Sequence, residues 1–514
     1  MNALLNRRTF LQASTLGLAG LRFGPGAQAS QTGAAGVPKI AKPAKTTVLF
    51  FLCGGSSHID MWDMKPEAPM EYRGEFKPIR TSAPDIHLCE HLPLLARQAH
   101  LFSMVHGVTD GGLATGDHHP GYYYNLTGHV PDQTFKQQGN DRRPSPDDWP
   151  YMGSVVGSKR PLHPSLPQVI SLPHKPSKLP FTRPGQFAGR LGVEHDPFYL
   201  IGDFDQPLNF SSPTLTLQGK GMTPERLQDR RALLHALDEA RADLDHTADA
   251  QSLERHQERA FDLLSSSAAA SSFDLTKEPV KIRERYGNTI NGTSLLMARR
   301  LVEAGVPFVT VYWKEDERTA DQCKSAGGWD THGDNFNCLR QYLLPQFDQA
   351  FSAFLEDLSQ RGLLDDTIVV LAGDHGEAFG QHPHNYTHSR MSYNENVRTP
   401  ALLLNRGLFP PRVVTAPTSH VDIVPTLLEV VGLEMPKVYR GVEQFPLSGV
   451  SMRYTFDAAP NAPTQKKRQF YSMLGTRGIW EDGWLAATVH APFTGKGHFD
   501  KDQWQLYHVD KDRS

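Results

Sequence analysis

A buried strand that ends in ligand-type side chains is the feature that constrains this chain most. Residues 367–371 form a continuous apolar run, and Gly373-Asp374-His375-Gly376 follows almost at once. Such a run is typical of a central strand in a parallel sheet, and ligands bind at the carboxyl edge of these sheets. The tetrapeptide places a carboxylate and an imidazole there, and both suit a divalent metal. An aspartate that caps the next helix, beside a loop histidine, is the alternative.

Other apolar runs predict the rest of the sheet. They occupy residues 48–52, 308–312 and 401–404. Apolar residues recur at helical spacing in 294–304 and 339–358, which predicts helices that pack on the sheet. This alternation predicts an α/β fold with a mainly parallel, doubly wound sheet that helices cover on both faces.

Two segments interrupt the alternation. Residues 223–265 are charged and begin with a good N-cap followed by proline, which predicts a helical insertion with a solvated face. Residues 132–222 are rich in proline and glycine without a sustained period, and we expect long loops that wall a substrate cleft. We therefore expect a core domain over 47–455 with insertions over 132–270.

The first 29 residues have the form of an export signal. Paired arginines at positions 7 and 8 precede a mildly apolar stretch, and residues 27–29 offer a small-residue cleavage site. This resembles a twin-arginine signal and predicts a periplasmic or extracellular protein, whereas a buried amphipathic helix is the alternative. Residues 30–46, rich in Gly, Ala, Pro and Lys, are expected to form a linker.

Composition excludes some classes of function. The 514 residues contain no apolar run long enough to span a bilayer, so no membrane span is expected. A formal net charge of -3 argues against a nucleic-acid partner, because phosphate binding requires a concentrated basic surface. The four cysteines are scattered, and both disulfide bonds and buried free thiols are compatible with them.

The sequence on both sides of the tetrapeptide resembles known families. In the C-terminal half, residues 379–382 resemble the Gly-rich loop of sulfatases and residues 393–400 resemble their strand entry. Residues 419–427 resemble the helix that follows, and residues 504–509 resemble the closing strand. The N-terminal half resembles the exported domain-of-unknown-function 1501 family, which is related to sulfatases, at residues 54–60, 72–76, 283–287 and 328–333. The chain is thus identified as a member of the alkaline phosphatase and sulfatase superfamily.

This resemblance implies an alkaline-phosphatase-like sheet with a small antiparallel subdomain at residues 456–514. It also implies a divalent metal site, for Ca, Zn or Mg/Mn, with ligands from the first strand end, a mid-chain segment, the Asp-His pair and one later histidine. The counterparts in this chain are Asp60, Asp330, His332, Asp374, His375 and His388.

The nucleophile position departs from the sulfatase pattern. Sulfatases carry a Cys-x-Pro-x-Arg box, but this chain has His118 in place of the cysteine and Tyr122 in place of the arginine, while Pro120 is kept. Formylglycine formation is therefore not expected. His118 and His119 could bind a metal, transfer protons or attack phosphorus, or they could be loop residues without a role. Water activated by the metal is the preferred nucleophile.

The resemblance implies an exported, metal-dependent hydrolase of sulfate or phosphate esters that acts on a small-molecule or glycan ester. The missing box favours an alternative, a catalytically inactive relative that binds an anionic glycan or a partner protein. Retention of the other candidate ligands favours the enzyme.

Overall fold

The computed structural model describes most of the chain from residue 43 onward. The described ranges are 43–106, 108–109, 118–178, 181–212, 271–376, 401–405, 407–416, 418–439, 442–459, 464–473, 476–488, 490 and 499–508. The expected signal peptide, nearly all of the linker, the helical segment 223–265 and His388 lie outside them. Among the described residues, no helix has the length and apolar character that crossing a membrane requires.

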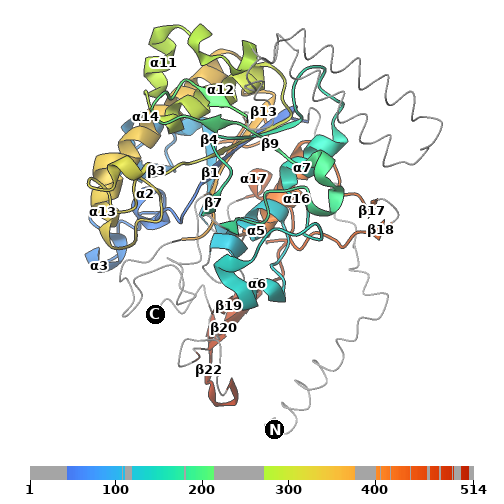
Figure 1. The fold of residues 1–514 in the computed structure, drawn as a ribbon. Coiled ribbons are helices and arrows are strands. Elements are labelled where there is room, and N and C mark those ends of the chain that lie inside the picture. The colour runs from blue at the N-terminus through green and yellow to red at the C-terminus, as the bar shows by residue number, and fades with distance from the viewer. Residues whose placement is uncertain are drawn as a thin grey trace, which may run out of the picture. The chain divides into compact units, whose positions relative to one another are not determined.

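An eight-stranded sheet forms the centre of the fold (Figure 1). Its strand order is β15-β4-β14-β13-β1-β12-β6-β9. In chain order the strands are β1 Thr46–Leu52, β4 Phe102–Val105, β6 Val169–Leu172, β9 Phe198–Tyr199, β12 Phe308–Tyr312, β13 Thr367–Gly373, β14 Ala401–Leu404 and β15 Val413–Val414. β1 pairs in parallel with β12 and β13. β14 runs antiparallel to β13 and β4. The predicted mainly parallel sheet is confirmed, with one antiparallel strand inside it.

Helices cover both faces of the sheet. Phe50 of β1 packs on Phe347 and Phe351 with ring centroids 5.9 and 5.5 Å away, whereas Phe51 packs on Tyr122 at 4.9 Å. Neighbouring residues of a strand point to opposite faces of the sheet. Phe347 and Phe351 therefore belong to the helix layer on one face, and Tyr122 belongs to the layer on the other (Figure 1). One layer holds α11 Val280–Tyr286, α12 Ile290–Glu303 and α14 Leu344–Gln360, and the other holds α5 His118–Thr127, α7 Met152–Lys159 and α16 Ile423–Val430.

The prediction that residues 132–222 form only loops is wrong. This segment supplies α7 and two strands of the central sheet, β6 and β9, which pair in parallel. β6 is buried throughout but has only four residues, with proline at 167 and at 173. A run so short between prolines gives no periodicity that distinguishes a core strand from a loop.

The remaining elements are short and lie mainly in connections. They are α2 His58–Met61, α3 Met70–Arg73, β2 Pro78–Arg80, β3 His87–Cys89, α4 Pro93–Ala96, β5 Val108–Thr109, α6 Gln133–Gln138, β7 Ser177–Lys178, β8 Phe181–Thr182, β10 Ile201–Gly202, β11 Phe210–Ser211, α13 Asn335–Cys338, β16 Thr418–Ser419, β17 Val438–Tyr439, β18 Val442–Glu443 and α17 Tyr454–Asp457. A π-helical turn at Leu339–Leu343 joins α13 to α14.

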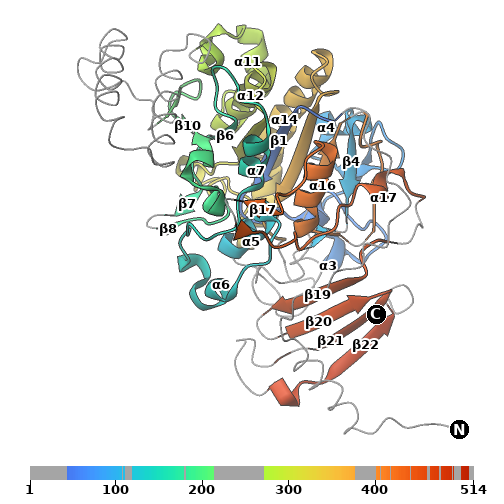
Figure 2. The same ribbon diagram turned by 90° about the vertical axis from the view of Figure 1, so that its right-hand side faces the viewer.

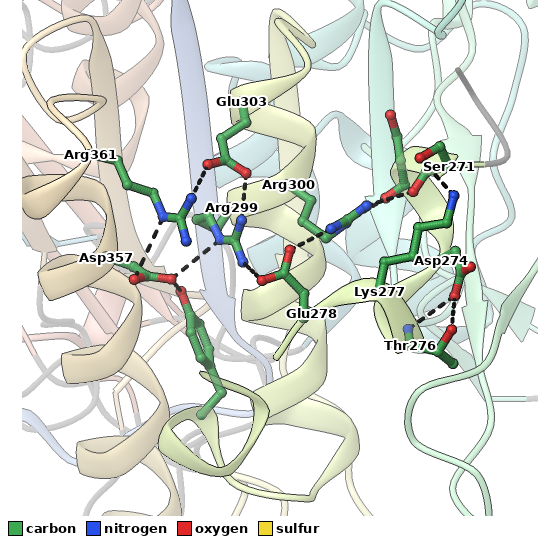
Figure 3. A network of polar contacts seen from close by, with 12 residues as sticks. Ser271, Asp274, Thr276, Lys277, Glu278, Arg299, Arg300, Glu303, Asp357 and Arg361 are labelled. Carbon is green, nitrogen blue, oxygen red and sulfur yellow. Dashed lines mark hydrogen bonds and ion pairs between the residues drawn. The ribbon is translucent and has the colours of Figure 1, made fainter. Parts of the chain in front are cut away.

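A buried ion network ties the α11, α12 and α14 layer together (Figure 3). Arg299 is 1% exposed, and its guanidinium nitrogens lie 2.6 Å from Glu278 Oε2 and 3.3 Å from Asp357 Oδ2. Tyr286 donates its hydroxyl to Asp357 over 3.1 Å, and Glu303 also pairs with Arg299. Arg300 also pairs with Glu278, and Arg361 pairs with Asp357 and Glu303. Loss of Arg299 therefore removes the most buried cation of the network but not every partner of its carboxylates.

The C-terminal residues form a separate antiparallel sheet of four strands (Figure 2). The strands are β19 Arg468–Met473, β20 Thr476–Glu481, β21 Trp484–Thr488 and β22 Trp504–His508, paired in chain order. This confirms the small antiparallel subdomain.

The structure distinguishes the two interpretations of the cysteines. Cys323 and Cys338 form a disulfide bond, whereas Cys53 and Cys89 are free thiols. The bond closes a loop between β12 and α14 that contains Asp330 and His332.

Candidate metal centre

Three predicted site residues meet at the carboxyl edge of the central sheet. Ligand-type atoms of His118, Asp374 and His375 all lie within 4.8 Å of one another. The Nδ1 atom of His118 is 2.8 Å from Asp374 Oδ2 and 3.1 Å from His375 Nε2. Asp374 and His375 follow β13, and His118 begins α5, so the group joins the sheet to its covering helix layer.

Two glycines after β1 position the Asp-His pair. The backbone amides of Gly54 and Gly55 donate to Asp374 Oδ1 over 2.8 and 3.0 Å, which leaves Oδ2 directed toward His118. Both glycines have positive φ values, 112° and 85°. A Cβ on Gly55 would lie 2.5 Å from His375 Nδ1, and one on Gly54 would lie 2.6 Å from the Asp330 amide. Only glycine combines this backbone conformation with such close approach.

A glycine and an amide dock α5 against the end of β13. A Cβ on Gly121 would lie 3.0 Å from the carbonyl oxygen of Asp374, so the helix backbone approaches this residue closely. The side chain of Asn125 donates to the same carbonyl oxygen over 3.2 Å. These contacts explain how His118, on the first turn of α5, reaches a carboxylate 256 positions away.

Asp330 and His332 extend the cluster from a second side. Asp330 Oδ2 lies 3.2 Å from His118 Nε2, and Asp330 Oδ1 lies 2.7 Å from His332 Nε2. His332 has a φ of 42°, in the left-handed region that few residues other than glycine adopt. The structure therefore brings five of the predicted site residues into one chain of contacts.

The protonation states within the cluster are interdependent. Burial and the positive charge of Arg183 lower the pKa of His118, but hydrogen bonds to Asp330 and Asp374 outweigh them and raise it above its ordinary value. Burial raises the pKa of Asp374, but the neighbouring His375 and His118 hold it well below the usual range. Burial lowers the pKa of His375. At neutral pH the cluster contains an ionised Asp374 and a neutral His375.

The donor atoms fit a divalent cation. His375 donates its Nδ1 proton to the carbonyl of Gly376 over 2.9 Å, so its Nε2 atom carries a lone pair. That lone pair lies 3.5 Å from the ionised Asp374 Oδ2, and the two acceptors repel unless a proton or cation lies between them. His118 Nδ1 completes the same group of donors. Imidazole nitrogens combined with carboxylate oxygens are typical ligands of zinc and related transition metals.

Two other predicted residues lie apart from the cluster. Asp60 is 1% exposed and accepts hydrogen bonds from the Ser57 hydroxyl and the Asn335 amide over 2.6 and 2.9 Å. Asn335 in turn accepts from Thr331 over 2.9 Å, so Asp60 supports the segment that carries Asp330. His119 donates Nδ1 to the carbonyl of Arg142 over 3.0 Å. His388 is outside the described residues.

Comparison with known proteins identifies the family. Residues 44–385 match the model of a family described as protein of unknown function (DUF1501). The chain belongs to the DUF1501 family. The match includes every predicted site residue of this DUF1501 chain except His388.

The DUF1501 chain also has sulfatase relatives. It is 26% identical over 141 residues to arylsulfatase K of Xenopus laevis, covering 27% of this chain and 26% of the relative. It is 34% identical over 103 residues to the ulvan-active sulfatase of Formosa agariphila, covering 20% of each chain. The chain thus spans about a quarter or less of the length of these relatives. The matches confirm the resemblance to sulfatases.

Among solved structures, the DUF1501 chain is similar to a phosphonate monoester hydrolase from Silicibacter pomeroyi. The TM-score is 0.46 with 14% sequence identity, over 91% of this chain and 90% of the other.

Proposed function

We propose that this chain is an exported, metal-dependent hydrolase of sulfate or phosphate esters. The observation that carries the proposal is the convergence of His118, Asp374 and His375 within 4.8 Å at the carboxyl edge of the sheet. That edge is where α/β proteins bind their ligands. The relatives of the chain include enzymes named as sulfatases. Export is inferred from the paired arginines and the cleavage site near residue 29.

The residues of the cluster have distinct roles in this proposal. Asp374 and His375 would hold the cation, and the Gly54 and Gly55 amides fix Asp374. His118 adds a nitrogen ligand and connects the cation site to Asp330. Two imidazoles favour zinc over calcium, which prefers oxygen ligands. When bound there, such a cation would polarise the ester oxygen and favour ionisation of a water molecule.

His118 is better suited to bind the cation than to attack the ester. Both of its ring nitrogens lie within 3.2 Å of a carboxylate, Nδ1 next to Asp374 and Nε2 next to Asp330. With a cation in place of the Nδ1 proton, Nδ1 would be a ligand while Nε2–H donates to Asp330, which leaves no lone pair to attack phosphorus. The hydrolytic nucleophile is therefore water rather than His118, which occupies the position of the sulfatase cysteine.

The test combines metal analysis of the purified full chain with hydrolysis of sulfate and phosphate esters. Wild type should contain a stoichiometric divalent metal and hydrolyse at least one ester, and Asp374→Asn should lose both. Asp316→Asn is the matched control, because Asp316 pairs with Arg318 outside the cluster and should keep both. Full metal content and turnover in Asp374→Asn would falsify the site assignment.

A second candidate is the catalytically inactive binder of an anionic glycan or partner protein. His118 in place of the sulfatase nucleophile is the observation that favours it. Bound metal without turnover of any ester, together with binding of a sulfated glycan, would establish the binder and reject the hydrolase.

A further inference from the structure

A second group of polar side chains lies along the same carboxyl edge as the metal cluster. We call it the Arg183 group, and its members are His174, Arg183, Tyr312, Lys314 and Glu315. His174 follows β6, and Lys314 and Glu315 follow β12. β13, β1, β12 and β6 are consecutive in the sheet, so the ends of β12 and β6 lie about 10 and 14 Å from the end of β13. One sulfate or phosphate group cannot occupy both places.

The chain holds Arg183 in a defined position. Its guanidinium carbon lies 4.8 Å above the ring of Tyr122, and that ring packs on Phe51 of β1 and Tyr312 of β12. Gly185 has a φ of 84°, and a Cβ on it would lie 2.7 Å from the Cα of Tyr123, so this turn lies directly on α5.

A buried glutamine fixes the same turn from within. Gln186 is fully buried and donates to the carbonyls of Pro176 and Arg183 over 2.8 and 2.7 Å. The backbone amide of Arg183 donates to Pro176 as well, over 3.2 Å. The backbone that carries the guanidinium is therefore organised in advance, which favours binding because less order must be imposed by the ligand.

Three polar groups of the set have no partner in the described part of the chain. No carboxylate there lies within ion-pair distance of the Arg183 guanidinium. The hydroxyl of Tyr312 and Nδ1 of His174 are buried without a hydrogen bond. Buried polar groups are normally satisfied, and the buried Arg142 illustrates this by pairing with Asp148. A water molecule or a ligand would satisfy groups of this kind.

The charges of the group favour an anion. The carboxylate of Glu315 lies 3.6 Å from Lys314 Nζ, so each offsets the other and Arg183 supplies the remaining positive charge. Burial lowers the pKa of His174 to about 3, and this side chain is therefore neutral. Arg183 stacks on Tyr122 of α5, whose ring packs on Phe51 of β1 and on Tyr312 of β12, so Arg183 lies between the metal cluster and the end of β12.

We propose that Arg183, with His174 and the Tyr312 hydroxyl, binds a second oxyanion of the substrate beside the ester held at the metal cluster. This oxyanion is a carboxylate or a second sulfate, which the guanidinium binds through paired hydrogen bonds. The substrate class is then a polyanionic glycan rather than an ester with a single charge. The position of the ester in this inference rests on the proposed function. Binding of the second oxyanion by Arg183 does not depend on it.

The kinetic test uses a sulfated disaccharide that contains a uronate and the same disaccharide with the uronate reduced to an alcohol. Wild type should prefer the uronate substrate. Arg183→Gln should reduce that preference about 10- to 100-fold, because a charge-assisted hydrogen bond is lost. Arg190→Gln is the matched control, since this arginine also stacks on an aromatic ring, that of Trp149, and should keep the wild-type preference. Equal losses on both substrates in Arg183→Gln would overturn the proposal, as would a wild type without preference.

A binding experiment separates this proposal from the proposed function. Calorimetry with the full-length Asp374→Asn chain measures binding of the unsulfated uronate disaccharide, and of a form with sulfate in place of the carboxylate. Arg183→Gln in the same background should raise the Kd at least tenfold for the preferred oxyanion. If wild type hydrolyses no ester but this difference holds, only the proposed function fails. If esters are hydrolysed and Arg183→Gln does not change the Kd, only the second oxyanion site fails.

Discussion

The imidazole of His118 and the carboxylate of Asp330 approach to 3.2 Å across 212 positions of the chain. This contact joins two parts of the candidate site, because His118 belongs to α5 whereas Asp330 belongs to the disulfide-closed loop after β12. His118 therefore links the Asp374–His375 pair to the Asp330–His332 pair.

The adjacent histidines of α5 should differ in their effect on metal binding. His118→Asn removes a donor from the cluster, and metal affinity should fall by at least about a hundredfold. His119→Asn should retain affinity, because His119 contacts the Arg142 carbonyl instead. Competition with a metal chelator measures both affinities. Equal affinities in the two variants would contradict the assignment of His118.

Gly55 should tolerate no side chain. Gly55→Ala forces a Cβ to within 2.5 Å of His375 Nδ1, so the imidazole must move and metal affinity should decrease at least tenfold. Gly362→Ala is a control with a similar positive φ of 68° and open space around it. It should cost about 1 kcal/mol of stability with metal binding retained. Thermal unfolding and metal titration of both variants distinguish site displacement from backbone strain.

The ion network around Arg299 should be important for stability. Arg299→Met leaves the buried Glu278 and Asp357 without this partner, and we expect a loss of about 3–5 kcal/mol in the free energy of unfolding. Arg468→Met removes an exposed pair with Glu481 and should leave the denaturation midpoint nearly unchanged. Guanidinium chloride unfolding compares the two. A midpoint for Arg299→Met equal to that of wild type would show that the network is not required.

Asp60 and Asp63 should have opposite effects on the pH dependence of stability. Burial raises the pKa of Asp60 from 3.8 to about 6, so its contribution is complete below pH 3.8 and is lost as pH rises through about 6. Asp60→Asn stays neutral, so its Tm should exceed that of wild type at pH 8 and match it near pH 4.

The opposite sign applies to Asp63. Burial raises its pKa, but His106 and Lys65 lower it more, so the folded value lies below 3.8. Its contribution is present above pH 3.8 and is lost as pH falls through the lowered value. Asp63→Asn should therefore lower the Tm at pH 8, and the difference should shrink toward pH 3. If the Tm differences from wild type changed with pH in the same direction for both variants, the opposite pKa shifts assigned to Asp60 and Asp63 would be wrong.

The sequence predicts the centre of the fold because β1, β12, β13 and β14 are apolar runs with polar ends. It does not predict the direction of β14, since a buried run is equally apolar in either orientation. It also misses β6, whose four residues lie between prolines. Short strands take their structure from neighbours that are distant in the chain.

The candidate site was predicted unevenly for a physical reason. Asp374 and His375 follow a strand, so their location depends on local sequence. The place of His118 depends on Gly121 and Asn125, which dock α5 against Asp374. Nothing in the sequence near His118 and His119 indicates which imidazole faces the cluster, because their orientation is set by that docking. Gly54 and Gly55 belonged to a recognised pattern, but their amide bonds to Asp374 appear only in three dimensions.

The bond between Cys323 and Cys338 makes one side of the site a covalent ring. It joins cysteines 15 positions apart, and closing a loop of this size removes about 3 kcal/mol of chain entropy from the unfolded state. Asp330 and His332 are thus tethered at both ends, whereas α5 is held against the site by packing and hydrogen bonds alone. When cations of different radius bind, the site should therefore adjust by displacement of α5, while the disulfide-closed loop keeps its position.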